Sequence, residues 1–260
     1  MLEILMATMH RNKISDLNLE KKNITSKILI INQTSFNETQ IEENKKMISY
    51  KGVGSSNSRN YAIKEASGEI CLIADDDIVY LNEYEKIVLS AFEKNPKADI
   101  ITFQIQCPDG TMFKSNYSNN EYWHNKRTIL KCSSIEIAFK RKSIIDNNLK
   151  FDTEFGLGSK YRVHDEVIFL MDALNRGLKL KYIPTPIVIH PKESSGTNYI
   201  DHLIISKGAA FVRLFGNKAY FYDIAFAVKK YKEYKMKYTF SKFLRLIFKG
   251  SIEYKQSHKI

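Results

Sequence analysis

The sequence predicts an α/β fold in which a mainly parallel, Rossmann-like sheet is covered by helices on both faces. Short β-rich runs alternate with helical patterns through the first hundred residues, and this alternation is typical of consecutive βαβ units. The chain has 260 residues, which suits one large domain or a domain with an appendage. Hydrophobic residues make up 43% of it, with 11 Gly and 5 Pro, a composition that can bury a core and excludes a low-complexity chain.

The first half of the chain supplies most of the expected sheet. We expect strands at 2–7, 27–32, 47–49, 69–74 and 98–106 because these runs are apolar and β-rich. Helical patterns lie between them at 57–67 and 81–94. The pattern at 81–94 is the clearer one, since its apolar residues recur at helical spacing on one face.

The second half contains a long polar segment and then a second structured block. Residues 107–125 are rich in Asn, Ser, Asp and Tyr, so we expect an irregular functional loop there. A strand at 135–141, a loop at 151–160, a helix at 165–176 and a pair of strands within 178–190 should follow. From there to residue 260 the pattern is helical and aromatic. We found no internal repeat.

Charge is concentrated at the end of the chain. Residues 227–260 contain ten Lys and Arg against two Glu, a net charge of +8 out of +11 for the whole chain. No run is long and apolar enough for a membrane-spanning helix, and the first residues lack the pattern of a secretory signal. The three cysteines form no CxxC pair, which favours a reducing, cytoplasmic location over a disulfide framework or a zinc ribbon.

Three consecutive aspartates, Asp75, Asp76 and Asp77, follow directly after the strand expected at 69–74. Adjacent carboxylates repel one another unless a cation neutralises them. Carboxylate oxygens at the end of a strand suit Mg²⁺ or Mn²⁺, which usually binds one or two carboxylates together with substrate phosphate oxygens. An acidic turn before the next helix is the structural alternative. The position favours a ligand site, because open sheets bind ligands beyond the carboxyl ends of their strands.

A Gly- and Ser-rich loop leads into a helix within residues 52–69. Its backbone N–H groups and the positive end of the helix could face an anion, with Arg59 adding a fixed charge and Asn60 a side-chain amide. The loop matches neither GxGxxG nor GxxxxGK[ST], so it is neither a dinucleotide fingerprint nor a P-loop. The alternative is an ordinary N-capped helix with Arg59 in solvent.

Asp165 and Glu166 open the amphipathic helix expected at 165–176. The helix dipole stabilises acids in a first turn, which is the common structural reason for such a pair. The functional interpretation is a general base at the floor of a cleft. His190 ends the last expected strand, and the other five histidines show no metal-binding spacing. A metal bound by the aspartates would give His190 a role as well.

Several of these segments together resemble the bacterial family-2 glycosyltransferases with the GT-A fold. They are ILMATMHR at the start, ILIINQ, SRNYAIKEASGEICLIADDD, HDEVIFLMDALNRG and IVIHP. The resemblance covers most of residues 1–198 and extends to enzymes that build capsular polysaccharide or lipopolysaccharide. It implies a GT-A domain at 1–200, with a nucleotide-binding half at 1–106 and an acceptor half at 107–200. A helical, basic extension would then occupy 201–260.

The resemblance also implies a role for each matched residue. Six of them would line the nucleotide: Ala7, Thr8, Asn32, Gln33, Arg59 and Asn60. Asp77 would bind the metal and Asp75 the metal or the ribose, with Asp76 included because the triple aspartate allows a register shifted by one. His190 would complete the metal site. Asp165 or Glu166 would be the base, with Glu166 aligned by its spacing to the following helix, although the family's usual order of the two acids is reversed here.

The implied activity is transfer of a sugar, with inversion, from a UDP-sugar to a glycan or a lipid-linked oligosaccharide. A divalent cation, Mn²⁺ or Mg²⁺, would stabilise the nucleotide-diphosphate leaving group, and the base would deprotonate the acceptor hydroxyl. One base and direct displacement imply inversion. The alternatives are a nucleotidyltransferase or a non-catalytic nucleotide-sugar-binding protein. A nucleotidyltransferase would be expected to carry glycine after the first strand, where ILMATMHRNK has none.

The basic segment 227–260 mixes Lys and Arg with Tyr, Phe, Leu and Ile. That pattern suits a helix lying on an anionic membrane, so we expect a peripheral enzyme at the inner face of the plasma membrane. The alternative is a solvated helix that packs its aromatic residues against the domain. We expect no nucleic-acid partner, because the positive charge lies outside the sheet domain and an Asp-rich cleft repels phosphate unless a metal ion is bound there.

Overall fold

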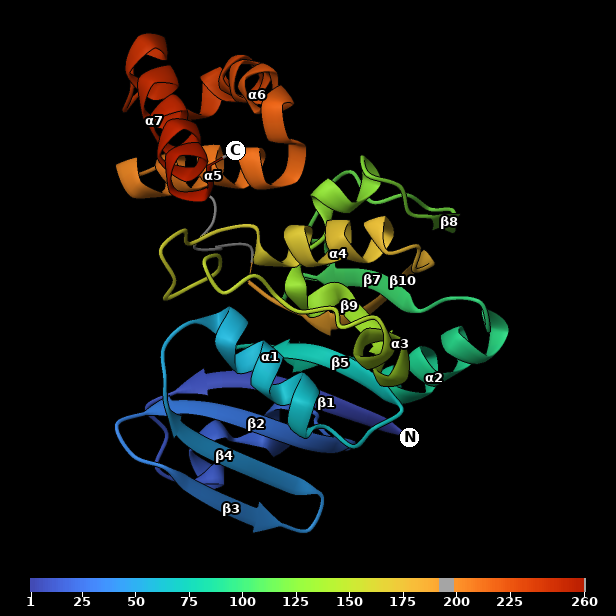
Figure 1. Ribbon diagram of the computed structural model, residues 1–260. Helices are drawn as coiled ribbons and strands as arrows, with labels where there is room; N and C mark the ends of the chain where they lie inside the picture. The colour runs from blue at the N-terminus through green and yellow to red at the C-terminus, as the bar shows by residue number, and fades with distance from the viewer. Residues whose placement is uncertain (192–198, 260) are drawn as a thin grey trace.

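The computed structural model describes residues 1–191 and 199–259 and contains one large sheet flanked by helices (Figure 1). The strand order is β3-β4-β2-β1-β5-β9-β7-β10-β6, and β8 also pairs with β10. The strands are β1 (Leu2–Met9), β2 (Lys27–Thr34), β3 (Glu38–Glu42), β4 (Lys45–Lys51), β5 (Ile70–Asp75), β6 (Val79–Tyr80), β7 (Ile100–Gln106), β8 (Tyr122–Trp123), β9 (Ile137–Lys140) and β10 (Leu180–Ile189). Strands β1, β2, β4, β5, β7 and β10 share one direction, so the expected mainly parallel α/β sheet is confirmed.

Helices cover both faces of this sheet. The helices are α1 (Ser55–Glu65), α2 (Tyr84–Lys94), α3 (Arg141–Asp146), α4 (Asp165–Asn175), α5 (Asp201–Phe215), α6 (Ala219–Tyr234) and α7 (Phe240–His258). Buried residues of α2 and of the short turns at 14–22 pack on one face. Buried residues of α1, α3 and α4 pack on the other. Strand β1 serves both layers, with Ile4 on the first side and Leu5 on the second, because successive side chains of a strand point to opposite faces.

The expected strand pair within 178–190 is wrong, because β10 is one continuous strand. Its pairing with β7 shifts register between Tyr182 and Pro186 and again between Pro186 and Val188. Proline has no N–H to donate to a strand ladder and is therefore found at irregular positions of a sheet. The prolines thus mark an irregularity inside a strand where a turn was expected.

Four regular elements were not expected from the sequence: β3, α3, and the two-residue strands β6 and β8. Strand β3 is largely exposed and, among residues 1–191 and 199–259, pairs only with β4, so it lacks the apolar signal of the buried strands. Helix α3 has six residues and follows β9 directly. The loop 107–125 is irregular as expected, apart from the two-residue strand β8.

The three C-terminal helices pack against one another beyond the sheet (Figure 1). Helices α5 and α7 cross closely because Gly208 and Gly250 face the opposite backbone. A Cβ at Gly208 would come 1.9 Å from the carbonyl oxygen of Ile247, and one at Gly250 would come 1.8 Å from that of Ile205. No helix of the described residues is long and apolar enough to cross a membrane.

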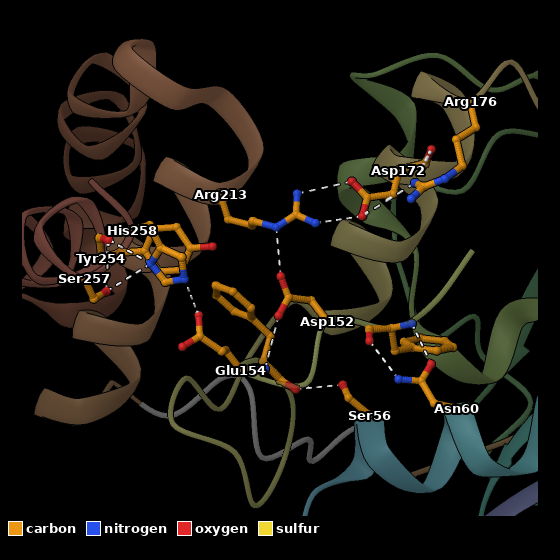
Figure 2. A network of polar contacts seen from close by, with 12 residues as sticks. Ser56, Asn60, Asp152, Glu154, Asp172, Arg176, Arg213, Tyr254, Ser257 and His258 are labelled. Atoms are coloured by element: carbon orange, nitrogen blue, oxygen red, sulfur yellow. Dashed lines mark hydrogen bonds and ion pairs between the residues drawn. The ribbon is translucent and has the colours of Figure 1, made fainter. Parts of the chain in front are cut away.

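Ion pairs join this helical extension to the sheet domain (Figure 2). Arg213 of α5 donates to Asp152 at 2.8 Å and to Asp172 of α4 at 2.7 Å. His258 at the end of α7 lies 2.8 Å from Glu154. These contacts fix α5 and α7 over the segment that precedes α4, and that segment borders the candidate site.

Candidate active site

A cavity of about 570 Å³ opens at the carboxyl ends of the parallel strands. The ends of β1, β5 and β10 meet there because these strands share one direction. The cavity brings together ten of the twelve residues that the sequence singled out, while the roles given to them remain predictions. These residues are Ala7, Thr8, Gln33, Arg59, Asp75, Asp76, Asp77, Asp165, Glu166 and His190.

Asp76, the middle aspartate, is neutralised from within the chain. Its carboxylate accepts hydrogen bonds from the Arg11 guanidinium at 2.9 Å and from the Thr8 hydroxyl. The ammonium group of Lys22 donates to the backbone carbonyl of Asp76 at 2.6 Å. Asp76 therefore fastens the loop after β5 to the end of β1.

Asp77 faces His190, with 3.5 Å between the carboxylate oxygen and Nε2. Nδ1 of His190 lies 2.6 Å from the carbonyl oxygen of Pro191. A carbonyl can only accept, so Nδ1 carries the hydrogen, and a neutral His190 directs the lone pair of Nε2 toward Asp77. Two lone-pair-bearing atoms at this separation suit a shared cation, and a backbone carbonyl on the other ring nitrogen is the usual partner of a metal-binding histidine.

The carboxylate of Asp75 contacts Arg59 and Ser134 and not His190. One of its oxygens lies 3.1 Å from Arg59, and the other accepts a hydrogen bond from the Ser134 hydroxyl at 3.4 Å. Across residues 1–191 and 199–259, no three His, Cys, Asp or Glu side chains form a group that could bind a metal ion. The residues present fit a divalent cation that two protein ligands hold and that substrate phosphate oxygens complete.

Arg59 connects the aspartate cluster to the second acidic pair. Its guanidinium donates to Asp75 and to Asp165, and it lies 5.5 Å from the ring centroid of Phe151. Only 7% of Arg59 is exposed. Burial would lower the pKa of Arg59, yet the carboxylates of Asp165 and Asp75 outweigh burial and raise it. Arg59 is therefore a permanent buried cation between two carboxylates and not a solvated helix residue.

Asp165 and Glu166 occupy different environments at the start of α4. Asp165 is buried and accepts from Arg59 and from the hydroxyls of Ser55 and Ser56. Glu166 lines the cavity. Burial, followed by the negative charge of Asp165, raises the pKa of Glu166 to about 8. The two carboxyl groups thus differ: Asp165 is the buried partner of Arg59, whereas Glu166 keeps its proton up to a pH of about 8.

Glycine makes this arrangement possible. Gly156 has a φ of +99°, and a Cβ there would lie 2.9 Å from the carboxylate carbon of Asp165. The loop before α4 therefore approaches the N-terminus of α1 more closely than a side chain would permit. The hydroxyl of Ser56 donates to the carbonyl of Phe155 at 2.7 Å and fixes that approach.

Two of the twelve residues lie outside the cavity lining. Asn32 is fully buried, and its amide donates to the carbonyl of Arg11 at 2.7 Å and to Ser49 at 2.9 Å. Asn60 makes two hydrogen bonds with the main chain of Phe151, at 2.7 and 2.8 Å (Figure 2). In this structure both asparagines hold neighbouring backbone in place. Gln33 borders the cavity, and its amide is fixed by Ser58 and Gly54.

Sequence reasoning missed cavity residues from later in the chain. Lys207 of α5 lines the cavity, together with Arg162 and His164 of the segment before α4. Ser134, which contacts Asp75, comes from the turn before β9. Lys207 follows no motif and lies in a helical pattern, so only the packing of α5 over the cavity identifies it.

One family model and several solved structures are similar to this chain. The model of Glycosyl transferase family 2 matches residues 37–168. No curated protein sequence matches the chain. The structure of S. aureus TarS 1-349 in complex with UDP-GlcNAc is similar with a TM-score of 0.64 and 14% identity, over 98% of this chain and 81% of that one.

Other TarS structures are similar as well. The complex of S. aureus TarS 1-349 with UDP has a TM-score of 0.60 and 12% identity, over 99% of this chain and 91% of that one. The S. aureus TarS chain of a further crystal structure has a TM-score of 0.57 and 14% identity, over 90% of this chain, which spans only 43% of that protein. At this identity the likeness shows a shared fold.

Proposed function

This chain belongs to glycosyl transferase family 2, and we propose that it transfers a sugar, with inversion, from a UDP-sugar to a hydroxyl of a surface-polysaccharide acceptor. One observation carries the proposal. One cavity is lined by the facing pair of Asp77 and His190, by Asp75, and by Arg59, which pairs with both Asp75 and Asp165 at the start of α4. A site for a charged leaving group and a site for a base thus share one cavity, as glycosyl transfer requires.

The donor end of the proposed site lies at the aspartates. Asp77 and His190 would hold a divalent cation, Mn²⁺ or Mg²⁺, which supplies positive charge to the diphosphate as it leaves. Gln33, Ala7 and Thr8 border the same cavity and would contact the nucleotide. The likeness to TarS, whose structure was solved with UDP-GlcNAc, supports a uridine nucleotide as donor.

The acceptor end lies at Glu166, which we assign as the base. Asp165 is engaged by Arg59 and two serine hydroxyls, whereas Glu166 faces the cavity with a pKa of about 8. The acceptor oxygen forms a bond to the anomeric carbon as the bond from that carbon to the phosphate oxygen breaks. The proton of the acceptor passes to Glu166, and UDP leaves with the bonding electrons.

The direct test incubates the chain with UDP-GlcNAc and Mn²⁺ and follows the products, with water as acceptor. Release of UDP from the wild type and its loss in Glu166→Gln are the expected results. The matched variant Glu154→Gln, outside the cavity, should remain active. A parallel reaction with UTP and GlcNAc 1-phosphate tests the alternative activity. Pyrophosphate release there, without UDP release in the first reaction, would identify a nucleotidyltransferase and overturn the proposal.

We further propose that helix α6 rests on the anionic inner face of the plasma membrane, next to a lipid-linked acceptor. Its outward side carries the apolar residues Phe221, Ile224, Val228 and Tyr231, of which Phe221 is 73% exposed and Val228 61%. Four exposed lysines lie on the last turns of α6 and just beyond it, and none of them forms an ion pair within the described residues. They are Lys229, Lys232, Lys235 and Lys237. An apolar stripe with adjoining lysines suits an interfacial helix.

Sedimentation with vesicles tests this face. The chain should bind vesicles of phosphatidylglycerol and phosphatidylcholine more tightly than phosphatidylcholine alone, and salt should weaken the binding. The double variant Phe221→Ser, Val228→Ser should bind weakly, while Ile145→Ser, which changes an exposed apolar residue on α3, should bind as the wild type does. Equal binding to both kinds of vesicle, or none, would contradict the proposal.

A further inference from the structure

The cavity is completed by a residue from the helical extension. Lys207 of α5 lines it, although α5 begins beyond the sheet domain. The hydroxyl of Ser206 accepts a hydrogen bond from the backbone N–H of Arg162 at 3.1 Å. That contact joins α5, one residue before Lys207, to the segment that leads into Glu166. The extension therefore contributes directly to the wall of the cavity on the side of the proposed base.

Lys207 is a buried cation without a hydrogen-bonding partner. It is 9% exposed, and within the described residues it makes no hydrogen bond or ion pair. Its ammonium nitrogen lies 5.5 Å from the ring centroid of Phe226. Burial lowers the pKa of Lys207. An ammonium group kept in this position without a partner costs stability, so a role in binding accounts for it better than a role in packing.

Two more nitrogen-bearing side chains, those of His164 and Arg162, line the same cavity. His164 lies directly before the acidic pair, and its Nε2 is buried with no hydrogen-bond partner in the described structure. Burial, followed by the charge of Lys207, lowers the pKa of His164 to about 3, so the ring is neutral and can donate one hydrogen bond. Arg162 is exposed at the cavity lining and forms no ion pair among the described residues.

These groups are complementary to an anion. A neutral ligand would leave the charge of Lys207 uncompensated, whereas a phosphate or carboxylate can accept hydrogen bonds from an ammonium, a guanidinium and an imidazole N–H together. In the proposed function the diphosphate of the donor binds at Asp77, so the anion at Lys207 would belong to another ligand. The charges that act on Lys207 include that of Glu166, so a ligand bound there would lie beside the base, where the acceptor enters.

We propose that Lys207, with Arg162 and His164, forms a subsite for an anionic group of the acceptor, carried close to the hydroxyl that is glycosylated. The anion is a phosphate or a carboxylate, and both would engage the same three side chains. This inference rests on the proposed function for the identity of the acceptor side. The subsite itself is a property of the described side chains and can be tested by binding alone.

The test is saturation-transfer NMR on the full chain saturated with UDP and Mg²⁺, which is diamagnetic, so that the donor site is filled. Glycerol 3-phosphate and glucuronate are the anionic probes, with glycerol and glucose as their neutral counterparts. We expect binding of at least one anionic probe and of neither neutral one. Lys207→Met keeps the length of the side chain and removes its charge, and it should weaken anion binding at least about tenfold.

The control variant is Lys242→Met, because its ammonium group also lies over an aromatic ring, that of Tyr238 at 5.2 Å, but outside the cavity. It should bind the anion as the wild type does. UDP binding by Lys207→Met reports that the variant is folded. If the variant binds the anion normally, or loses affinity for UDP in step with the anion, the acceptor subsite is refuted.

Failure of the proposed function would look different. A wild type that binds UDP but neither anion contradicts the subsite alone. A wild type that does not bind UDP contradicts the proposed donor site. In that case the anion titration is repeated without nucleotide on the wild type and on Lys207→Met, and it still tests the subsite. Loss of anion binding in the variant supports it there, and unchanged binding refutes it.

Discussion

Replacement of Asp165 by asparagine should move the pH dependence of catalysis toward acid. Asp165 is the negative neighbour that, after burial, keeps the pKa of Glu166 at about 8 instead of its ordinary 4.5. Asparagine keeps the size of the side chain and removes the charge. The same change frees Arg59, which then has only Asp75 as its carboxylate partner and also favours an ionised Glu166.

The size of the effect follows from the usual influence of one adjacent charge, which changes a pKa by about 1–3. The pKa of Glu166 should fall to between about 5 and 7, because burial still keeps it above the ordinary value. At pH 6 the active, deprotonated fraction would be about 1% for a pKa of 8 and about 50% for a pKa of 6. At pH 6 the variant should therefore release UDP faster than the wild type does.

The assay is UDP release from UDP-GlcNAc between pH 5 and 9. Asp172→Asn is the matched control, since Asp172 lies on the same helix and pairs with an arginine outside the cavity. Its pH midpoint should equal that of the wild type. An Asp165→Asn variant that is inactive at every pH would identify Asp165 as the base and refute the assignment to Glu166. An unchanged midpoint would refute the electrostatic coupling.

Three further substitutions test the packing around the site. Gly208→Ala should lower the thermal midpoint, because a Cβ cannot fit against the carbonyl of Ile247. Asn60→Ala should cost about 1–3 kcal/mol of stability in chemical denaturation, since it leaves the main chain of Phe151 without two hydrogen bonds, and should leave UDP affinity unchanged. Burial raises the pKa of Asp223 to about 7, so the free energy of unfolding should fall from pH 4 to 7 in the wild type. That decline should be weaker in Asp223→Asn. Unchanged stability of Gly208→Ala or Asn60→Ala, or an unchanged pH dependence of stability in Asp223→Asn, would contradict the corresponding argument.

The sheet could be predicted from the sequence because its buried strands carry unbroken apolar runs. Strand β2 is buried along almost its whole length and lies where its pattern places it. Strand β3 could not be predicted, because an exposed edge strand carries polar residues. The prolines of β10 were misread for a related reason. A register shift inside a strand and a turn between two strands share the same local residues, and only pairing with β7 distinguishes them.

The candidate site was predictable where it follows strand ends and helix starts. The aspartates after β5 and the acids at the start of α4 converge because parallel strands bring their carboxyl ends to one edge. Long-range partners were not predictable. Nothing in the residue spacing indicates that Arg11 neutralises Asp76 or that Lys207 reaches the cavity. The spacing also does not indicate that the Asn60 amide donates a hydrogen bond to a main-chain carbonyl 91 positions away.

Isothermal titration calorimetry with UDP, in the presence and absence of Mn²⁺, tests the donor site most directly. The wild type should bind UDP more tightly with Mn²⁺, and Asp77→Ala should abolish that metal-dependent gain, because Asp77 and His190 face each other at 3.5 Å. Asp146→Ala, which removes an exposed carboxylate on α3, should behave as the wild type does. Absence of UDP binding by the wild type under all conditions would contradict the glycosyltransferase account.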